Sequence, residues 1–406
     1  MKDTKFRTHL QIVKNNHDEI RDLIGLQLRS AALGLIQDLF TEEVGRLCGA
    51  PFVRKQGYCH RGGSEQGSVV VQGQRMSVKR PRVRNAAGEV HLESYDALQS
   101  FDLLCDKVTS RMLRGVSTRN YDPLLDELQN GLGLKKSSVS KAFKMSSQQA
   151  LDEMNSRDLA SYRFVSLMLD GIEFGGHMVI CALGITDKGQ KLILGLREGD
   201  TENAEVCVDL LQSVIERGLK SDVPMLFVID GSKALRKAIR KIFGEKAFVQ
   251  RCVRHKERNI VSYISDQYHM EFYRRWKRLH GCSNFYEAEI EYKKMAQWLG
   301  NINHEALHSL EEAAMETLTV IKLNCPSFLR KTLASTNPIE SAFSKARDIT
   351  RRIKNWKSDS TQISRWAATA MLETEKQFKA IKGFKQIPML VMEMENLMVA
   401  IKNKVA

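Results

Sequence analysis

The feature that most constrains the fold is a series of short apolar segments that begins near Tyr162, each bounded by residues that favour turns. Phe164–Leu169, His177–Thr186 and Leu192–Leu196 have the length and β-branched content of strands. The second and third are separated by Asp187-Lys188-Gly189, a turn sequence. These three segments therefore predict an antiparallel meander, with the first strand ending at Asp170-Gly171.

The pattern changes after the third segment, because apolar strands begin to alternate with helices. Helical spacing at 204–217 precedes Val223–Ile229, whose near-continuous apolar character predicts a strand buried on both faces. A helix at Lys233–Phe243, a short strand at Ala247–Cys252 and a further helix at His255–Ile264 follow. The order predicts an α/β core with a mixed five-stranded sheet, antiparallel strands first and parallel strands after.

The segments on either side of this core read mainly as helix. The first 50 residues carry apolar residues at helical spacing, and residues 265–330 are wholly helical in pattern. Between Gly67 and Val83 β-branched alternation around Gln72-Gly73-Gln74 predicts a hairpin. Residues 106–155 predict three short helices, with a glycine-containing turn at Gly131-Leu132-Gly133 before a basic helix that starts near Ser137. That outline is typical of a helix-turn-helix, and also of many ordinary helical pairs.

The charge of the chain indicates the class of its partner. Among 406 residues, 62 Lys and Arg outnumber 48 Asp and Glu, which gives a net charge of +14. The surplus gathers in three stretches: 51–84 has eight basic residues, 231–258 has ten, and 347–357 has five. Three separated basic stretches fit a long polyanion better than one small anionic ligand. A nucleic acid is therefore the expected partner, with an anionic membrane surface as the weaker option, although any single stretch is equally consistent with a solvated face.

Other compartments and partners are disfavoured by the same sequence. Apolar stretches such as Met178–Ile185 fall far below the ~18 residues that a membrane span requires. The first seven residues lack the apolar core of a signal peptide, and the eight cysteines are scattered. We expect a cytosolic protein with reduced thiols and no membrane partner.

Two aspartates stand where buried strands are expected to end. Asp170 follows Val165–Leu169, and Asp230 follows Pro224–Ile229. If the two strands are neighbours, a spacing of about 4.8 Å brings the carboxylates close enough to share cations. Hard oxygen ligands favour Mg²⁺ or Mn²⁺ over zinc. The alternative is that an acid followed by glycine is only a turn or a helix cap.

A third acid, Glu340, lies in Ser335–Phe343 at the start of a predicted helix. Asn337 as N-cap, Pro338 at the first position and Glu340 at the third predict a capping box, so the glutamate could act as a cap alone. Further along, Arg347, Arg351 and Lys354 return to its side at helical spacing. A carboxylate at the head of a basic stripe is what a metal site on a phosphate backbone requires.

Cys252 and His255 form one Cys-x-x-His pair, which is half of a tetrahedral zinc site. Its other half is not evident, so a buried cysteine with a nearby structural histidine is favoured over zinc. The sequence contains neither a Gly-x-Ser-x-Gly elbow nor a Gly-x4-Gly-Lys-[Ser/Thr] loop. Serine hydrolase and ATP-driven activities therefore have no support.

Six segments of the chain resemble the catalytic domain of Mutator-type transposases of bacterial insertion sequences, in family order over about 160–360. They are Leu169–Ile172, Ala182–Ile185, Leu194–Asp200, Val228–Leu235, Gln250–Asn259 and Ser335–Ser341. The most specific is the string Gln250–Asn259 followed, about 80 residues later, by the motif around Glu340. The basic amino-terminal region resembles the DNA-binding part of the family more loosely.

The resemblance implies a ribonuclease-H-like core with a metal-binding Asp-Asp-Glu triad, carried here by Asp170, Asp230 and Glu340. The gap of 110 residues from Asp230 to Glu340 accommodates the all-helical insertion that the family places before its glutamate. Cys252 and His255 match a family signature near the second aspartate, with a structural or DNA-contacting role. Two Mg²⁺ or Mn²⁺ ions per site are implied as cofactors.

This organisation predicts six parts of the chain. They are a helical segment (1–50), a basic β-hairpin module (51–100), a helix-turn-helix-like region (101–158), the first part of the core (159–264), the helical insertion (265–333) and the core completion with the glutamate helix (334–406). The residues expected to bind DNA are Arg54, Lys55, Lys79, Arg80, Arg82, Arg84, Lys135, Lys136, Lys233, Arg347, Arg351 and Lys354.

The expected function is a DNA transposase that binds terminal inverted repeats and performs metal-dependent cleavage and strand transfer into target DNA. Cutting two ends in one assembly implies a homo-oligomer, at least a dimer on DNA. Two alternatives remain open at this point: a catalytically inactive DNA-binding repressor, and a structure-selective nuclease of the same fold.

Overall fold

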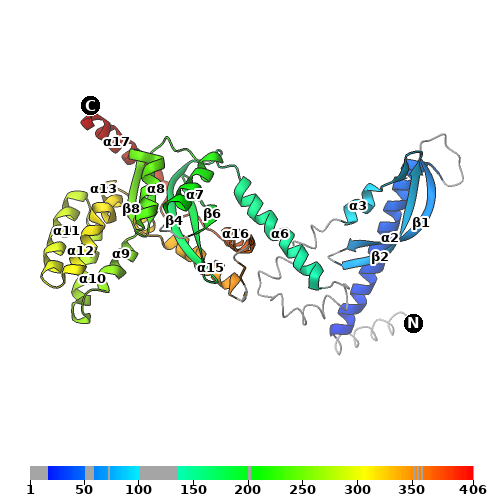
Figure 1. The fold of residues 1–406 in the computed structure, drawn as a ribbon, viewed down its shortest axis with the longest axis horizontal. Coiled ribbons are helices and arrows are strands. Elements are labelled where there is room, and N and C mark those ends of the chain that lie inside the picture. The colour runs from blue at the N-terminus through cyan, green and yellow to red at the C-terminus, as the bar shows by residue number, and fades with distance from the viewer. Residues whose placement is uncertain are drawn as a thin grey trace, which may run out of the picture. The chain divides into compact units, whose positions relative to one another are not determined.

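The computed structural model of the chain describes residues 17–50, 59–71, 74–99, 136–199, 203–351, 353, 356–357 and 360–405. Figure 1 labels their helices and strands. They belong to two compact units, with the border between Ser146 and Ser147, inside helix α6 (Lys136–Ser156). The six-part division expected from the sequence remains a prediction.

The first unit packs one long helix against a small antiparallel sheet. Helix α2 (His17–Cys48) precedes strands β1 (Cys59–Val71), β2 (Gln74–Asn85) and β3 (Gly88–Val90), which pair in the order β1-β2-β3 and are followed by α3 (Glu93–Gln99). Ile36 and Phe40, four residues apart on α2, pack with Val69 and Val78 of the hairpin, since residues at that spacing share one helix face. The predicted hairpin is confirmed, and the helix predicted for the first 50 residues is confirmed over His17–Cys48, since residues 1–16 lie outside the described ranges.

Strand β1 begins eight residues earlier than the alternation predicted, at Cys59 rather than Gly67. Its register against β2 shifts between Arg61 and Ser64, where Gly63 has a φ of +85°. Such a bulge breaks the period-two pattern on which the sequence expectation depended. The strand is therefore longer than its apolar part.

Part of the predicted helix-turn-helix lies outside the described residues. The basic helix expected from Ser137 is α6, which begins at Lys136. Residues 101–135, with Lys135, lie outside the described ranges, as do Arg54, Lys55, Lys354 and the side chain of Lys136. The helix-turn-helix therefore remains a prediction.

The second unit is built on the expected mixed sheet of five strands. These are β4 (Phe164–Phe174), β5 (His177–Thr186), β6 (Lys191–Glu198), β7 (Met225–Ile229) and β8 (Ala247–Arg251), in the spatial order β6-β5-β4-β7-β8. The first three pair antiparallel, whereas β7 runs parallel to both β4 and β8. Strands β4 and β7, which carry or precede the two aspartates, are therefore neighbours, as expected.

Strand β4 does not end at Asp170, so that part of the sequence interpretation was wrong. The strand continues to Phe174, with Asp170 paired opposite Cys181 in the middle of the β4–β5 ladder. The turn is made instead by Gly175 and Gly176, whose φ values are +59° and +85°. A two-residue hairpin loop of type I′ needs positive φ at both positions, which this Gly-Gly pair adopts without strain.

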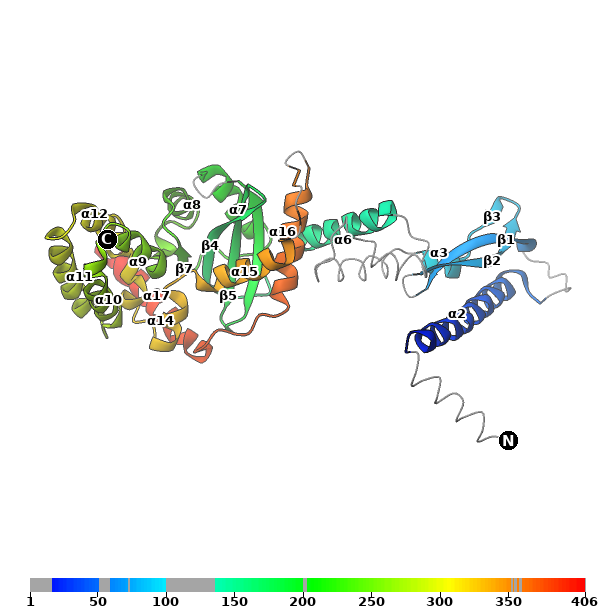
Figure 2. The same ribbon diagram turned by 90° about the horizontal axis from the view of Figure 1, so that it is seen from below.

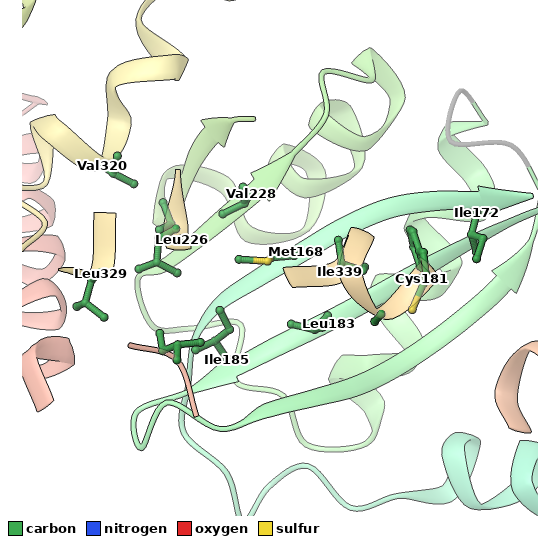
Figure 3. Close-up of a cluster of buried hydrophobic side chains, with 14 of the residues drawn as sticks. Met168, Ile172, Cys181, Leu183, Ile185, Leu226, Val228, Val320, Leu329 and Ile339 are labelled. Atoms are coloured by element: carbon green, nitrogen blue, oxygen red, sulfur yellow. The ribbon is translucent and has the colours of Figure 1, made fainter. Parts of the chain in front are cut away.

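Helices cover both faces of the sheet (Figures 1 and 2). On one face α7 (Ala204–Glu216) and α8 (Lys233–Phe243) bury Leu210 and Leu235 against Leu167 and Phe227. On the other face lie α15 (Asn337–Thr350) and α16 (Gln362–Glu375), which pack on β4 and β6 respectively. Figure 3 shows Ile339 of α15 over the strand surface that carries Met168, Leu183 and Cys181.

The segment after β8 is helical, as predicted. It contains α9 (Val253–Val261), α10 (Asp266–Gly281), α11 (Phe285–Gly300), α12 (His304–Glu312), α13 (Thr319–Lys322) and α14 (Ser327–Leu333). Short 3₁₀ turns occur at Gly244–Lys246, Ala314–Leu318 and Phe384–Gln386, before the last helix α17 (Ile387–Val405). Among the described residues, the helices include none with the length and hydrophobicity needed to cross a bilayer.

Candidate active site

The parallel pairing of β4 with β7 sets the two aspartates side by side. Leu169 pairs with Ile229, so Asp170 and Asp230 are the next residues on adjacent strands. Met168 and Ile172, which flank Asp170 at a spacing of two, belong to the core beneath α15. Side chains two residues apart share one face of a strand, so Asp170 faces the side of the sheet that α15 covers.

Local hydrogen bonds orient both carboxylates. Oδ1 of Asp170 accepts from the amide of Gly171 at 2.8 Å, and Oδ1 of Asp230 accepts from the amide of Ser232 at 3.0 Å. The helix cap after β7 is Ser232, whose hydroxyl accepts from the amide of Leu235 at 3.2 Å. Asp230 therefore does not serve as the N-cap of α8, which was one alternative for this residue.

Glu340 enters the site from the first turn of α15, although the capping box predicted there is wrong in detail. The helix begins at Asn337 with Thr336 as its N-cap, so Glu340 is one position further into the helix than expected. Its carboxylate oxygen Oε1 accepts from the hydroxyl of Thr336 at 2.7 Å. Its amide donates to the carbonyl of Thr336 at 3.0 Å.

The electrostatics of Asp170 show that the three acids act on one another. The side chain is buried, with a residue exposure of 7%, and burial is the main cause that raises its pKa to about 7. The charges of Asp230 and, more weakly, Glu340 raise the pKa further, whereas the Gly171 amide and His255 lower it. Burial and the neighbouring acids therefore disfavour the ionised form of Asp170, which a nearby cation would stabilise.

Cys252 and His255 lie against Glu340 and come from the start of α9. Cys252 is fully buried, and its Sγ accepts from the amide of Thr336 at 3.4 Å. Nε2 of His255 lies 3.8 Å from Oε1 of Glu340, and Nδ1 lies 3.4 Å from the Thr336 hydroxyl. Because its side chain has no exposed surface, Cys252 cannot contact DNA in this arrangement.

The charges around His255 favour its protonated form. A hydrogen bond with Cys252 raises the pKa of His255 most, and Cys252, Asp170 and Glu340 add to the effect against the cost of burial, giving about 9. Burial by itself raises the pKa of Cys252, but hydrogen bonds from His255 and Thr336 outweigh it and lower that pKa. Cys252, His255 and Thr336 therefore form a polar network next to Oε1 of Glu340.

Two donor sets share Glu340. The ligand atoms of Cys252, His255 and Glu340 lie within 4.8 Å of one another, which is close enough for a single transition-metal ion. Asp170, Asp230 and Glu340 form the second set, whose ligand atoms are all carboxylate oxygens and whose charges act together on the pKa of Asp170.

The basic residues predicted to bind DNA differ in their exposure and in whether they form ion pairs with acids. Lys233, Arg347 and Arg351 are exposed at the ends of α8 and α15, and Lys79 and Arg84 are exposed on β2. By contrast, Arg80 and Arg82 of β2 form ion pairs with two acids: Arg80 with Glu65 at 2.7 Å and Glu89 at 2.5 Å, and Arg82 with Glu89 at 2.7 Å. Arg80 also lies over the ring of Tyr95, 5.0 Å from its centroid.

Sequence reasoning assigned no role to Thr336, although this residue connects Cys252 with Glu340. The four-residue spacing from Thr336 to Glu340 was a usable signal, because a hydroxyl four residues before a carboxylate reaches it on a helix. Arg251 was also missed: a Cβ at Gly231 would lie 2.3 Å from its guanidinium, which places Arg251 against the backbone beside Asp230.

Comparison with known proteins identifies the family of the chain. Residues 3–380 match the profile of the family described as "Transposase, Mutator family". The chain is 27% identical over 338 residues to the transposase for insertion sequence element IS1201 of Lactobacillus helveticus, covering 80% of this chain and 88% of that protein.

Two further relatives are similar over shorter segments. The transposase for IS6120 of Mycolicibacterium smegmatis is 26% identical over 58% of this chain and 73% of its own length. The transposase for IS256 in transposon Tn4001 of Staphylococcus aureus is 31% identical over 37% of this chain and 39% of its own length. The chain therefore belongs to the Mutator family of transposases.

Proposed function

We propose that the protein is a DNA transposase that binds the terminal inverted repeats of an insertion sequence, cleaves the element ends and joins them to target DNA. The observation that carries this proposal is the convergence of Asp170, Asp230 and Glu340 from three distant segments, with the pKa of Asp170 raised to about 7 by burial and by the other two acids. The sheet order β6-β5-β4-β7-β8, antiparallel and then parallel, supports a ribonuclease-H-like core.

The three carboxylates suit binding of Mg²⁺ or Mn²⁺ better than a purely structural role. Three carboxylates that repel one another around a buried position destabilise the fold unless a cation compensates them. Oxygen-only ligands are the preferred ligands of Mg²⁺ and Mn²⁺. Asp170, Asp230 and Glu340 would hold two such ions, which supply Lewis-acid stabilisation of the attacking and leaving oxygens of a phosphodiester.

The residues of the chain itself provide positioning and charge. The Gly171 and Ser232 amides fix one oxygen of each aspartate, so their remaining oxygens are available as ligands. We assign phosphate contacts to three exposed basic residues: Lys233 at the start of α8, Arg347 on α15 and Arg351 at the C-cap of that helix. These phosphate contacts would hold the scissile strand over the acids without reading its sequence.

End recognition is assigned to the first unit together with α6. Lys79 and Arg84 supply exposed charge on the hairpin, whereas the ion-paired Arg80 and Arg82 would have to exchange Glu65 and Glu89 for phosphates. We further propose that two copies of the chain act together on two element ends. A cytoplasmic, nucleoid-associated location follows from DNA as the substrate.

The test is to incubate the full-length protein with duplexes carrying its flanking element ends and Mg²⁺, and to map the products. We expect cleavage at the ends and joined products, both lost in Asp170→Asn, Asp230→Asn and Glu340→Gln while end binding is kept. Asp348→Asn, an exposed acid on the same helix as Glu340, is the matched control and should be fully active.

The other outcomes identify the alternatives. Cleavage without joined products would mean a nuclease, and specific end binding without cleavage by the unaltered protein would mean a repressor. Zn²⁺ bound with an affinity that depends on Cys252 and His255 but not on Asp170 would favour the sulfur-containing donor set instead.

A further inference from the structure

Thr336 is the most highly connected polar residue of the site, and it is fully buried. Its hydroxyl lies 2.7 Å from Oε1 of Glu340, 3.3 Å from Sγ of Cys252 and 3.4 Å from Nδ1 of His255. Its amide donates to the same sulfur at 3.4 Å, and its carbonyl accepts from the amide of Glu340 at 3.0 Å. Backbone and side chain of Thr336 therefore both hold Glu340.

The hydroxyl has one hydrogen to donate, so these contacts are not equivalent. The carboxylate oxygen is the closest acceptor and carries negative charge, which gives the shorter and stronger bond. The hydroxyl therefore donates to Glu340, and its lone pairs face the imidazole and the thiol. This direction of donation fixes Oε1 and leaves Oε2, which has no hydrogen-bond partner among the described residues, available to a ligand.

The anchor of Thr336 is itself fixed to the sheet. The amide of Cys252 donates to the carbonyl of Ile229, the last residue of β7, at 2.7 Å. The amide of Val253 donates to the carbonyl of Ala334 at 2.9 Å. Cys252 thus connects Ile229, the residue before Asp230, with Thr336, which contacts Glu340.

We propose that Thr336 is a positioning residue that orients the carboxylate of Glu340 for metal binding, with the buried Cys252 as its anchor. This inference depends on the proposed function, because it takes Glu340 to be a metal ligand. A glutamate in a first helical turn is otherwise free to adopt several rotamers, and a fixed carboxylate binds a cation at lower entropic cost. Cys252 is accordingly a support for the ligand and not a ligand itself.

The hydroxyl is tested most cleanly by comparing Thr336→Ala with Thr336→Ser, which differ only in that group. Mn²⁺ is titrated into the full-length protein and free Mn²⁺ is followed by electron paramagnetic resonance. We expect Thr336→Ala to bind Mn²⁺ roughly 10- to 100-fold more weakly than the unaltered protein, the range typical of lost outer-shell partners. Thr336→Ser should restore binding to within about threefold.

A matched control separates this effect from the loss of any buried threonine. Thr350 lies on the same helix, is 4% exposed, and donates to the carbonyl of Ala346 within the helix at 3.0 Å. Thr350→Ala should bind Mn²⁺ with unchanged affinity. Thermal melting and element-end binding, measured for all three variants, show whether each remains folded. If Thr336→Ala does not fold, Thr336→Val is compared with the unaltered protein instead, because valine and threonine have the same shape and differ only in a methyl group in place of the hydroxyl.

Two results would be decisive against the proposal. Equal Mn²⁺ affinity of folded Thr336→Ala and Thr336→Ser would show that the hydroxyl does not position Glu340. A loss in Thr350→Ala equal to that in Thr336→Ala would assign the effect to packing. Failure of the proposed function is recognised separately, because Mn²⁺ affinity would then be unchanged by Asp170→Asn and Glu340→Gln.

Discussion

Glu312 neutralises two buried positively charged side chains. Its replacement by glutamine is the most informative test of how the helical segment between β8 and α15 is attached to the core. The carboxylate at the end of α12 accepts a bidentate pair of bonds from Arg251 at 3.1 and 2.9 Å. Lys256 of α9 donates to the same carboxylate at 2.7 Å. The side chains of Arg251 and Lys256 are only 5% and 2% exposed.

The size of the effect follows from the pKa of Glu312. Burial alone raises this pKa, but hydrogen bonds from Arg251 and Lys256 and their charges outweigh burial and lower it to about 2, from an ordinary 4.5. At about 1.36 kcal/mol per pKa unit this shift corresponds to roughly 3 kcal/mol. The carboxylate keeps 29% exposure, so solvent screening reduces the value to about 2 kcal/mol. Leaving two buried cations uncompensated can increase the cost towards about 4 kcal/mol.

The assay compares Glu312→Gln with Glu311→Gln, its exposed neighbour on the same helix. At about 2–4 °C per kcal/mol for a unit of this size, Glu312→Gln should lower the melting temperature by about 4–16 °C. Amide hydrogen exchange should accelerate in peptides from α9, α12 and β8. Equal melting temperatures and equal exchange in the two variants would refute the reasoning.

The pH dependence supplies a second check on the same residue. A carboxyl whose folded pKa is depressed contributes stability above its unfolded pKa and loses it as the pH falls through the folded value. The difference between the unaltered protein and Glu312→Gln should therefore be constant above about pH 5 and shrink between about pH 4.5 and 2. A difference that grows on acidification would contradict the assigned sign.

Three further changes have defined outcomes. Gly231→Ala should destabilise the protein more than Gly244→Ala in thermal melts, because both glycines have positive φ but only the Cβ at Gly231 would meet Arg251, at 2.3 Å. Burial, with smaller contributions from neighbouring arginines, lowers the pKa of His280 to about 3, so the unfolded chain gains a proton below pH 6.5 that the folded chain does not. The unaltered protein should therefore lose up to about 2 kcal/mol more stability than His280→Gln between pH 7 and pH 5 in urea unfolding, and an equal loss would exclude a buried neutral histidine. Arg347→Ala should weaken binding alike on specific and random duplexes and reduce the salt dependence of log K by about one unit, whereas a sequence-selective loss would mean that the residue reads bases.

The sheet was predictable because its strands are buried on both faces. An apolar run such as Val223–Ile229 leaves little choice of structure, and the structure places β7 at Met225–Ile229. Helix α8 was predicted to the residue, since its buried positions alternate with basic ones at helical spacing. Burial patterns are local in sequence, and prediction succeeds where they are regular.

The errors occurred where a local signal competed with pairing to a distant segment. Asp170-Gly171 is a common turn sequence, but ten residues of β5 pair along β4 and carry the strand past it. Asn337-Pro338 predicted a helix start one residue late, because Thr336 is held by Cys252, 84 residues away. No periodicity encodes a contact of that range, so the network around Glu340 could not be derived from the sequence.

These long-range contacts give the helical segment between β8 and α15 a role in the site. Arg251 ends β8 and touches the backbone beside Asp230, while Glu312 holds Arg251 from the far end of that segment. The next residue, Cys252, anchors Thr336 and through it Glu340. Two adjacent residues thus connect the helical segment to two of the three acids. Loss of the Glu312 carboxylate should therefore change the position of Asp230, through Arg251, more than that of Glu340. Cys252 retains its own backbone hydrogen bond to Ile229, so the support of Glu340 is kept. Cleavage of element ends should accordingly fall in Glu312→Gln. The loss of Mn²⁺ affinity caused by Thr336→Ala should be the same whether position 312 is Glu or Gln.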